Sequence, residues 1–408
     1  MQTNRSDLAA PASQATGKPS LFQRAAKVFE GWTDPDTKLG VLRVRPKNIP
    51  WQPGLLHTLY HQQECFLDGG EKMLLRVSRR RPHEPHTYLV DLTTGEATCP
   101  FPPDCGVIEI SDGTYVALLA HGEKGRGVVH MLWDLRQQKT LLALPPDDGW
   151  WRGAFQRLCD GRRAIVAQYK GKPYDEPVHT QFLLLDPDAP TRMILDAEGY
   201  SCNHIQSCPT DVNLIAYDRW PCPKRRAEQV IHLMTLDGSF HEMLKMTDKT
   251  MRPGSIWGGQ RDHYNWTPDG RRIVSYFSPN DVDTTHRFNH FEFGWWFSAT
   301  DWRTGEDLAA EYPPGRWGGH MQITPDSRFA VSATGPGYDF LYAIDIEGIR
   351  KGWNERILCR YPQTLSQGTN KDPFHMPWVL PDASGVVFAA GWPGDQDGVY
   401  LVEWPNDM

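Results

Sequence analysis

Histidines recur at one fixed place in this 408-residue sequence, six or seven residues before an aspartate that begins a turn. The clearest instance is His263, which is followed by Asp269 and then by the apolar segment 273–277. The same relation joins four more histidines to turn aspartates, namely His61, His204, His320 and His375. Imidazole is the commonest metal ligand in proteins and titrates near neutral pH. Several such side chains meeting at one place could bind a divalent first-row metal while another accepts a proton.

The turns after these histidines belong to an internal repeat that runs through most of the chain. Each unit reads as a turn headed by Asp, an apolar strand, a loop, and a second apolar strand that ends in Asp or a similar turn residue. The turn aspartates recur every 44 to 58 residues, at Asp68, Asp112, Asp160, Asp211, Asp269, Asp326 and Asp382. Units of this length and number predict the four-stranded blades of a seven-bladed β-propeller.

The two ends of the chain predict how this ring closes. The last unit ends at the strand 399–404 and lacks an outer strand, whereas the segment 39–45 is a strand without a partner. Pairing the two would remove the exposed sheet edges of an open array. We therefore expect an all-β fold, with a single seven-bladed β-propeller over 30–408 closed by its N-terminal strand. Residues 1–29 are expected to be a flexible tail with one short helix near its end.

Composition limits the partners and the compartment. A net charge of −7, with acidic and basic residues interspersed, disfavours nucleic acid as a partner. No apolar run approaches the roughly 18 residues of a membrane helix, and the N-terminus lacks the apolar core of a signal peptide. The eight cysteines include no Cys-x-x-Cys pair and are expected to be reduced. These features predict a cytoplasmic protein without nucleic acid or membrane partners, either a monomer or a homodimer.

The propeller would bring the histidines together, because the innermost strands of all blades begin at one face around the central channel. Residues six or seven positions before the Asp turns lie at those strand starts. Successive side chains of a strand point to opposite faces. On the fifth inner strand this predicts that Asn265 and His263 both point into the channel, while Tyr264 and Trp266 pack inside the blade. The residues expected to converge are His57 or His61, Arg152, His204, His263, His320 and His375.

Four segments resemble the oligogalacturonate lyases, a family of polysaccharide lyases built as seven-bladed propellers. They are 56–69, Asn203-His204, the run from Asp262 to Gly270 with its His-Tyr-Asn-Trp-Thr-Pro-Asp-Gly core, and Gly319-His320-Met321. The resemblance implies β-elimination on an anionic uronate oligosaccharide, in which a histidine removes the proton α to the carboxylate. It also implies a divalent metal, usually manganese with calcium or zinc as alternatives, held by histidines and a glutamine.

Carried over residue by residue, the resemblance matches His263 to the base and His320 to one metal ligand. The further metal candidates are His375, His204 and Gln367. The family's arginine falls near Val230, so Arg226 or Arg219 is expected to replace it as a catalytic residue. We expect His57, His61, Arg152 and Asn265 to contact substrate.

Other functions stay open at this point. The last repeat has one histidine, at 375, where the family has a Gln-x-x-His-Pro-His run. This departure favours the alternatives of a lyase, isomerase or epimerase acting on another uronate, of the glucuronate or ulvan type. A non-catalytic propeller that binds a glycan or a protein is the alternative from a different class. A hydrolase is disfavoured, because the sequence has no Gly-x-Ser-x-Gly motif.

Overall fold

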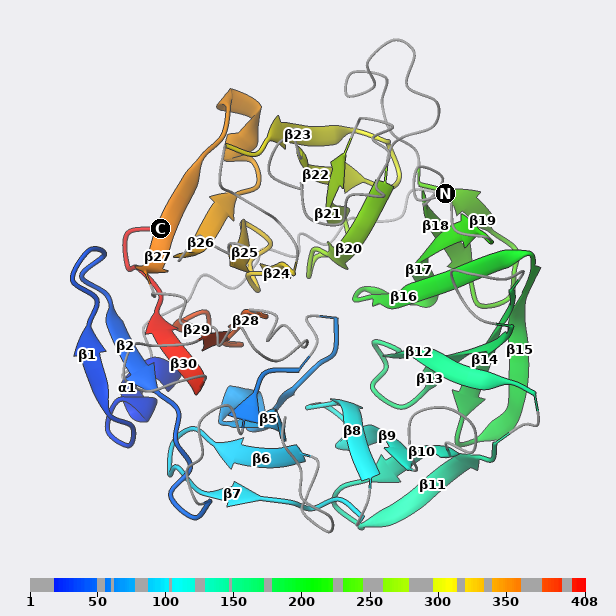
Figure 1. The fold of residues 1–408 in the computed structure, drawn as a ribbon, viewed down its shortest axis with the longest axis horizontal. Coiled ribbons are helices and arrows are strands. Elements are labelled where there is room, and N and C mark those ends of the chain that lie inside the picture. Colours follow the sequence, from blue (N-terminus) through cyan, green and yellow to red (C-terminus); the bar gives the residue numbers. More distant parts are fainter. Residues whose placement is uncertain are drawn as a thin grey trace, which may run out of the picture.

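The computed structural model is a ring of β-sheets around a central axis (Figure 1). It describes residues 18–49, 56–59, 62–77, 87–102, 105–121, 129–146, 149–171, 178–222, 230–244, 260–278, 296–313, 320–333, 340–360, 376–390 and 398–408. The described strands form seven sheets, and the strands of each sheet follow one another outward from the axis. This arrangement confirms the seven-bladed propeller predicted from the repeat.

Blades 1 to 4 follow one another in sequence order. In blade 1 the inner strand is split into two short pieces, β3 and β4, which both pair with β5. The strands of these blades are β3 (Leu56–His57), β4 (Phe66–Leu67), β5 (Lys72–Val77), β6 (Thr87–Asp91) and β7 (Ala97–Thr98); β8 (Cys105–Ile110), β9 (Val116–His121), β10 (Val129–Asp134) and β11 (Lys139–Leu144); β12 (Trp151–Arg157), β13 (Ala164–Lys170), β14 (His179–Asp186) and β15 (Ala189–Glu198); and β16 (Tyr200–Cys208), β17 (Asp211–Pro221), β18 (Val230–Thr235) and β19 (His241–Met243).

Blades 5 to 7 complete the ring, and blade 7 combines both ends of the chain. Their strands are β20 (Gln260–Trp266), β21 (Arg272–Ser278), β22 (Trp296–Asp301) and β23 (Asp307–Glu311); β24 (Gln322–Ile323), β25 (Phe329–Ala333), β26 (Phe340–Asp345) and β27 (Glu355–Arg360); and β28 (Trp378–Val379), β29 (Gly385–Ala390), β30 (Gly398–Glu403), β2 (Gly40–Arg43) and β1 (Gly31–Thr33). As predicted, the N-terminal strand β2 pairs with β30, with Leu42 opposite Leu401. A further outer strand, β1, was not predicted.

The short helix expected near the end of the N-terminal tail is present. Helix α1 (Leu21–Ala25) begins at Ser20, whose side chain accepts a hydrogen bond from the backbone N–H of Gln23. The backbone N–H of Leu21 donates to Asp382 (2.7 Å), and that of Phe22 donates to Ser384 (3.0 Å). The helix is therefore docked on the Asp turn of blade 7.

The hydrophobic core lies between the faces of neighbouring blades. Between blades 4 and 5, for example, Ala216 and Leu233 pack in one cluster with Tyr264 and Trp266. Tyr264 and Trp266 are buried, as strand alternation predicted. Because each sheet is covered on both faces, the inner strands are fixed relative to one another, and so are the side chains that they point at the axis.

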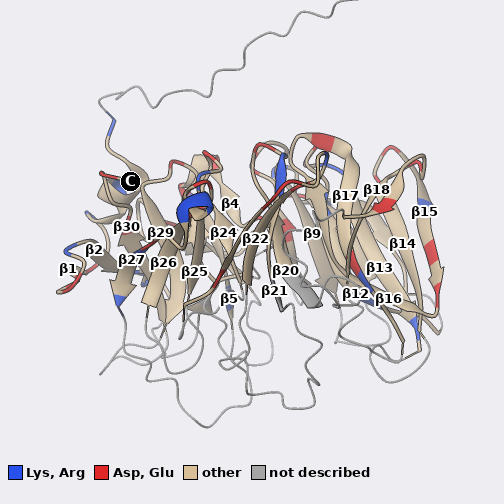
Figure 2. Cartoon of the chain, turned by 90° about the horizontal axis from the view of Figure 1, so that it is seen from above, with Lys and Arg blue, Asp and Glu red and all other residues tan. Residues whose placement is uncertain are grey.

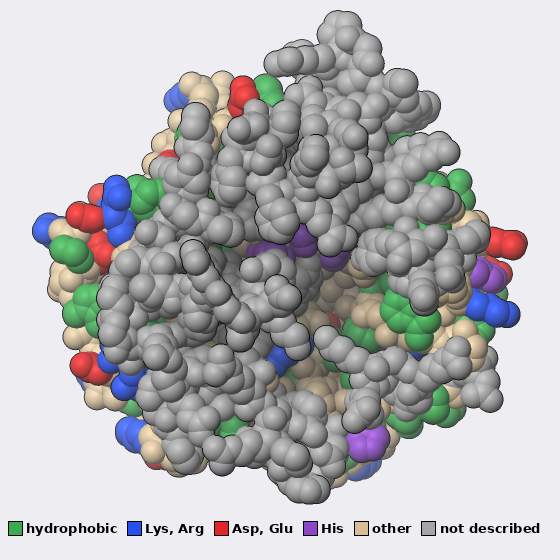
Figure 3. Space-filling view, viewed as in Figure 1, with side chains coloured by type: hydrophobic (Ala, Val, Ile, Leu, Met, Phe, Trp, Pro, Cys, Tyr) green, Lys and Arg blue, Asp and Glu red, His purple; other side chains and the backbone are tan. Residues whose placement is uncertain are grey.

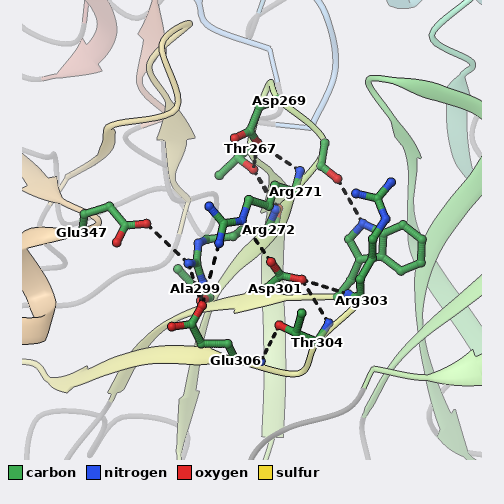
Figure 4. Close-up of polar contacts among 12 residues, drawn as sticks. Thr267, Asp269, Arg271, Arg272, Ala299, Asp301, Arg303, Thr304, Glu306 and Glu347 are labelled. Atoms are coloured by element: carbon green, nitrogen blue, oxygen red, sulfur yellow. Dashed lines mark hydrogen bonds and ion pairs between the residues drawn. The ribbon is translucent and has the colours of Figure 1, made fainter. Parts of the chain in front are cut away.

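The Asp turns close one face of the disc, where many acidic and basic side chains lie along the turns (top of Figure 2). In blade 5 these charges form a network, drawn in Figure 4. The Arg272 guanidinium, which is 4% exposed, contacts Glu306 (3.2 Å) of its own blade and Glu347 (3.4 Å) of blade 6. Arg271 pairs with Asp301 (3.0 Å), whose carboxylate also accepts the backbone N–H groups of the next turn. The Arg272–Glu347 pair thus connects blade 5 to blade 6 at the face opposite the histidines.

Candidate active site

Three histidines from consecutive blades lie side by side along the inner strands. His320 comes just before β24, as predicted, whereas His204 and His263 lie in the middle of β16 and β20 and not at the strand starts. The ring centroids of His204 and His263 are 5.1 Å apart, and those of His263 and His320 are 4.5 Å apart. Figure 3 shows histidine side chains at the hollowed centre of this face. The structure thus brings together the histidines of blades 4, 5 and 6, as the repeat register predicted.

A β-bulge positions each of the first two histidines. In β16, Asn203 pairs with Asp218 and Gln206 pairs with Ala216, so the inner strand holds one extra residue. β20 shows the same shift between Asp262 and Asn265. His204 and His263 lie in these bulges with φ angles of 46° and 47°. A left-handed backbone at a non-glycine residue costs on the order of 1–3 kcal/mol and is concentrated at functional sites.

Each of these imidazoles is held by the second strand of its own blade. His204 Nδ1 lies 2.6 Å from Asp218 Oδ2, and Asp218 is completely buried. His263 Nδ1 lies 2.7 Å from the Tyr276 hydroxyl oxygen. Since β17 and β21 lie outside the inner strands, both imidazoles are held from the side away from the axis. Bonds of this kind to Nδ1 fix the orientation of an imidazole that acts through Nε2, either on a metal or on a proton.

Asp218 and Tyr276 are the functional residues that sequence reasoning missed. Each is a polar residue within an otherwise apolar strand, in the runs Leu-Ile-Ala-Tyr-Asp and Ile-Val-Ser-Tyr. A buried carboxylate in such a strand needs a partner, because an unpaired buried charge is expensive. The sequence therefore indicates that Asp218 has a partner, but it does not indicate which residue that partner is.

Polar side chains of the inner strands join neighbouring blades just below the histidines. The Gln206 amide donates to Asn265 Oδ1 (2.9 Å), and the Asn265 amide donates to the backbone carbonyl of Met321. Gln62 reaches from blade 1 to the backbone carbonyl of Tyr264 in blade 5 (3.0 Å). Both ends of the buried Asn265 amide are thus used between blades 4, 5 and 6, and its contact with substrate stays a prediction.

Two predicted arginines also contact other groups of the protein. Arg152 donates to the backbone carbonyls of Leu144 (3.0 Å) and Pro145 (2.5 Å), next to the outermost strand of blade 2. The Arg219 guanidinium stacks on the ring of Tyr200, 3.7 Å from its centroid. Because strand residues alternate in direction, Arg219 lies on the opposite face of β17 from Asp218. These contacts hold the two guanidinium groups against a backbone segment and an aromatic ring, and the predicted roles of Arg152 and Arg219 stay predictions.

The other predicted residues lie partly or wholly outside the described part of the chain. His57 is in β3, where its backbone pairs with Arg76, but its side chain is not described. His61, Arg226, Gln367 and His375 all fall outside the described residues. Within the described ranges, no group of three or more His, Cys, Asp or Glu side chains is arranged to hold a metal ion. The roles of the predicted residues outside the described part of the chain remain predictions.

The opposite wall of the channel carries carboxylates instead of imidazoles. Glu109 of β8 is completely buried and accepts hydrogen bonds from the Gln156 amide (3.0 Å) and the Arg157 backbone N–H (2.7 Å). The Arg157 guanidinium pairs with Glu64, whose side chain is 60% exposed. Burial raises the pKa of the Glu109 carboxyl to about 7, while the Arg157 guanidinium acts in the lowering direction.

The fold and this site define a seven-bladed β-propeller with an imidazole cluster at one mouth of its channel, and comparison with solved structures identifies which propellers it resembles. An oligogalacturonate lyase in complex with manganese matches with a TM-score of 0.70 and 19% identity, over 93% of this chain and 97% of that chain. An oligogalacturonate lyase from Vibrio parahaemolyticus matches with a TM-score of 0.69 and 18% identity over the same shares. The resemblance found in the sequence is thus confirmed for the fold.

Other comparisons add little about function. A chain of the mitotic checkpoint complex also matches, with a TM-score of 0.53 and 12% identity over 100% of this chain and 99% of that chain. No model of a known protein family matches the sequence, and no curated protein does either. Since propellers of one fold serve different functions, the function must be argued from the histidines.

Proposed function

We propose that the protein is a polysaccharide lyase that cleaves short uronate oligosaccharides by β-elimination, with His263 as the general base. The observation that carries the proposal is the position of His263, between His204 and His320 and held from behind by Tyr276. The similarity to two oligogalacturonate lyases in fold supports the class of reaction. A carbon–oxygen bond would break without addition of water.

The proposed chemistry asks for a neutral imidazole that can reach a weakly acidic proton. The hydrogen on C5 of a uronate lies next to the carboxylate, and its removal leaves negative charge that spreads onto that carboxylate. His263 would take this proton at Nε2 while Nδ1 donates to the Tyr276 oxygen. A general base of this kind contributes on the order of 10²–10⁴-fold to the rate.

A divalent metal, manganese in the first place, is part of the proposal. The described donors fit such an ion in part: His320 supplies an imidazole at the channel wall, and imidazole suits first-row metals. Of the other ligands predicted from the sequence, His375 and Gln367 lie outside the described residues, while His204 is bonded through Nδ1 to Asp218. When bound, the ion would neutralise the substrate carboxylate, a contribution comparable to the roughly 3–4 kcal/mol of a well-placed donor.

The compartment and the substrate form belong to the same proposal. None of the eight cysteines forms a disulfide, which agrees with a reducing compartment such as the cytoplasm. Among the described helices, none is both long enough and apolar enough to cross a membrane. A cytoplasmic lyase would receive short oligosaccharides that have already been taken up.

The direct test is incubation of the purified protein with a panel of uronate oligosaccharides, including galacturonate and glucuronate oligomers, with manganese added or removed by a chelator. We expect ultraviolet absorbance from the new carbon–carbon double bond conjugated to the carboxylate. A panel in which no uronate gives this absorbance under either metal condition would reject the lyase proposal in favour of a binding propeller.

A further inference from the structure

The two neighbouring imidazoles of the site are held by chemically different partners. Asp218, which holds His204, is a completely buried carboxylate that also accepts the backbone N–H of Asn203 (3.0 Å). Tyr276, which holds His263, is a neutral phenol whose hydroxyl oxygen lies 2.7 Å from His263 Nδ1. Both imidazoles are thus fixed in orientation at Nδ1. His204 is therefore an oriented imidazole placed directly beside the proposed base.

The spacing of the two rings decides on which sides of a sugar they can act. A pyranose ring held between an acid and a base would keep them about 7–8 Å apart, because each contact requires about 3.5–4.0 Å. The ring centroids of His204 and His263 are 5.1 Å apart. Both rings are also fixed from the same side, through strands β17 and β21 of adjacent blades. They must therefore approach the same face of the sugar.

Resting on the proposed β-elimination, we propose that His204, held by Asp218, is the general acid and acts beside His263 on one face of the sugar. The site would then select uronates whose C5 hydrogen and C4 oxygen project from the same ring face. Glucuronate and mannuronate have this arrangement. In galacturonate, the C4 oxygen lies on the face opposite the C5 hydrogen, so an acid beside the base cannot reach it.

The step balances within the substrate and the two histidines. The C5 proton moves to His263 Nε2, and the electron pair of the C5–H bond forms the C4–C5 double bond. The C4–O4 bond breaks with its electron pair on O4, which takes the proton from His204 Nε2. The products are a 4,5-unsaturated uronate and a sugar that keeps O4 as a hydroxyl. His263 then loses its proton and His204 regains one through water.

The first arm of the test compares substrates that differ at C4. The wild-type protein with manganese is given oligomers of glucuronate and of galacturonate, matched in length, and kcat/KM is measured from the double-bond absorbance. We expect glucuronate to be favoured by about 100-fold or more, the lower bound for an acid that cannot reach its oxygen. Preference for galacturonate would overturn the one-face pair and leave the lyase proposal intact. Elimination of neither of these, nor of mannuronate oligomers in the same assay, would instead reject the lyase proposal itself.

The second arm tests His204 itself with two leaving groups. One substrate is a glucuronate disaccharide, and the other is a glucuronate with fluoride at C4, which leaves without needing a proton. His204→Gln should lose about 10²–10⁴-fold on the disaccharide but less than about tenfold on the fluoride. The matched control, His263→Gln, should lose activity on both, since both require the C5 proton to be removed. Equal loss by His204→Gln on both substrates, or loss of bound metal in that variant, would contradict the acid role.

Discussion

The two halves of the channel wall are built from the same repeat but differ in backbone and in charge. On the side of blades 1 to 3, Glu109 is buried and bonded by N–H groups of its neighbours. On the side of blades 4 to 6, imidazoles face the axis. The inner strands of blades 2 to 5 all contain a register shift, but among the described residues only His204 and His263 occupy such a shift with positive φ. Chemistry is thus expected where the inner strands hold a histidine in a left-handed backbone conformation, while Glu109 joins blades 1, 2 and 3.

Replacing His263 with Ala should give the largest effect on activity. Elimination should fall by about 10²–10⁴-fold in kcat, because the proton acceptor is lost. The free energy of unfolding and the metal content should stay near the wild-type values, because the half-buried ring contributes little to the core. Double-bond absorbance would measure the kcat, urea unfolding the free energy of unfolding, and metal analysis the metal content. A variant that keeps more than a tenth of the wild-type kcat would move the base to another residue.

Replacing Glu109 with Gln tests the other half of the wall. Burial raises the pKa of this carboxyl to about 7, so the folded protein binds a proton that the unfolded chain releases near pH 4.5. The protonated Glu109 then stabilises the folded protein fully below pH 4.5. This stabilisation is lost as the pH rises through 7, and the free energy of unfolding falls by an amount on the order of 3 kcal/mol. Urea unfolding at several pH values should show this decline in the wild type and not in Glu109→Gln. Equal declines in both proteins would show that Glu109 stays ionised when folded.

Replacing Tyr276 with Phe should have an intermediate effect, confined to the histidine half. The hydroxyl that orients His263 is removed while the stacked ring remains, at 5.8 Å between centroids. Loss of such a supporting partner typically costs about 10–100-fold in activity. The kcat should fall by that amount with little change in KM. An unchanged kcat would mean that packing alone orients His263.

Replacing Arg272 with Met, at the face opposite the histidines, should have the smallest effect. Its partners Glu306 and Glu347 are 41% and 56% exposed, so solvent screens the ion pairs. We expect a loss of about 1 kcal/mol in the free energy of unfolding. Activity of the folded protein should not change. A fall in kcat without a fall in stability would show that the two ends of blade 5 are coupled.

Much of the fold could be predicted because the repeat records it directly. The Asp turns and the unpaired strand at 39–45 fixed the number of blades and the closure of the ring. The directions of the site's side chains were predicted less well. The prediction assumed that side chains alternate between the two faces of a regular strand. The bulge between Asp262 and Asn265 breaks the alternation, so His263 faces the axis while Asn265 turns to its neighbour blades. A long side chain such as that of Arg152 can donate to any of several nearby backbone carbonyls, and its position in the sequence does not predict which one.

The central claim, that the histidine half performs an elimination, is tested most directly by the masses of the products. Mass spectrometry of a uronate oligosaccharide after incubation with the wild-type protein would identify both fragments. Our account predicts that the two fragment masses add up to the mass of the substrate, with the double bond on one fragment, and that His263→Ala forms neither. Fragments that together exceed the substrate by one water would show hydrolysis and contradict the account.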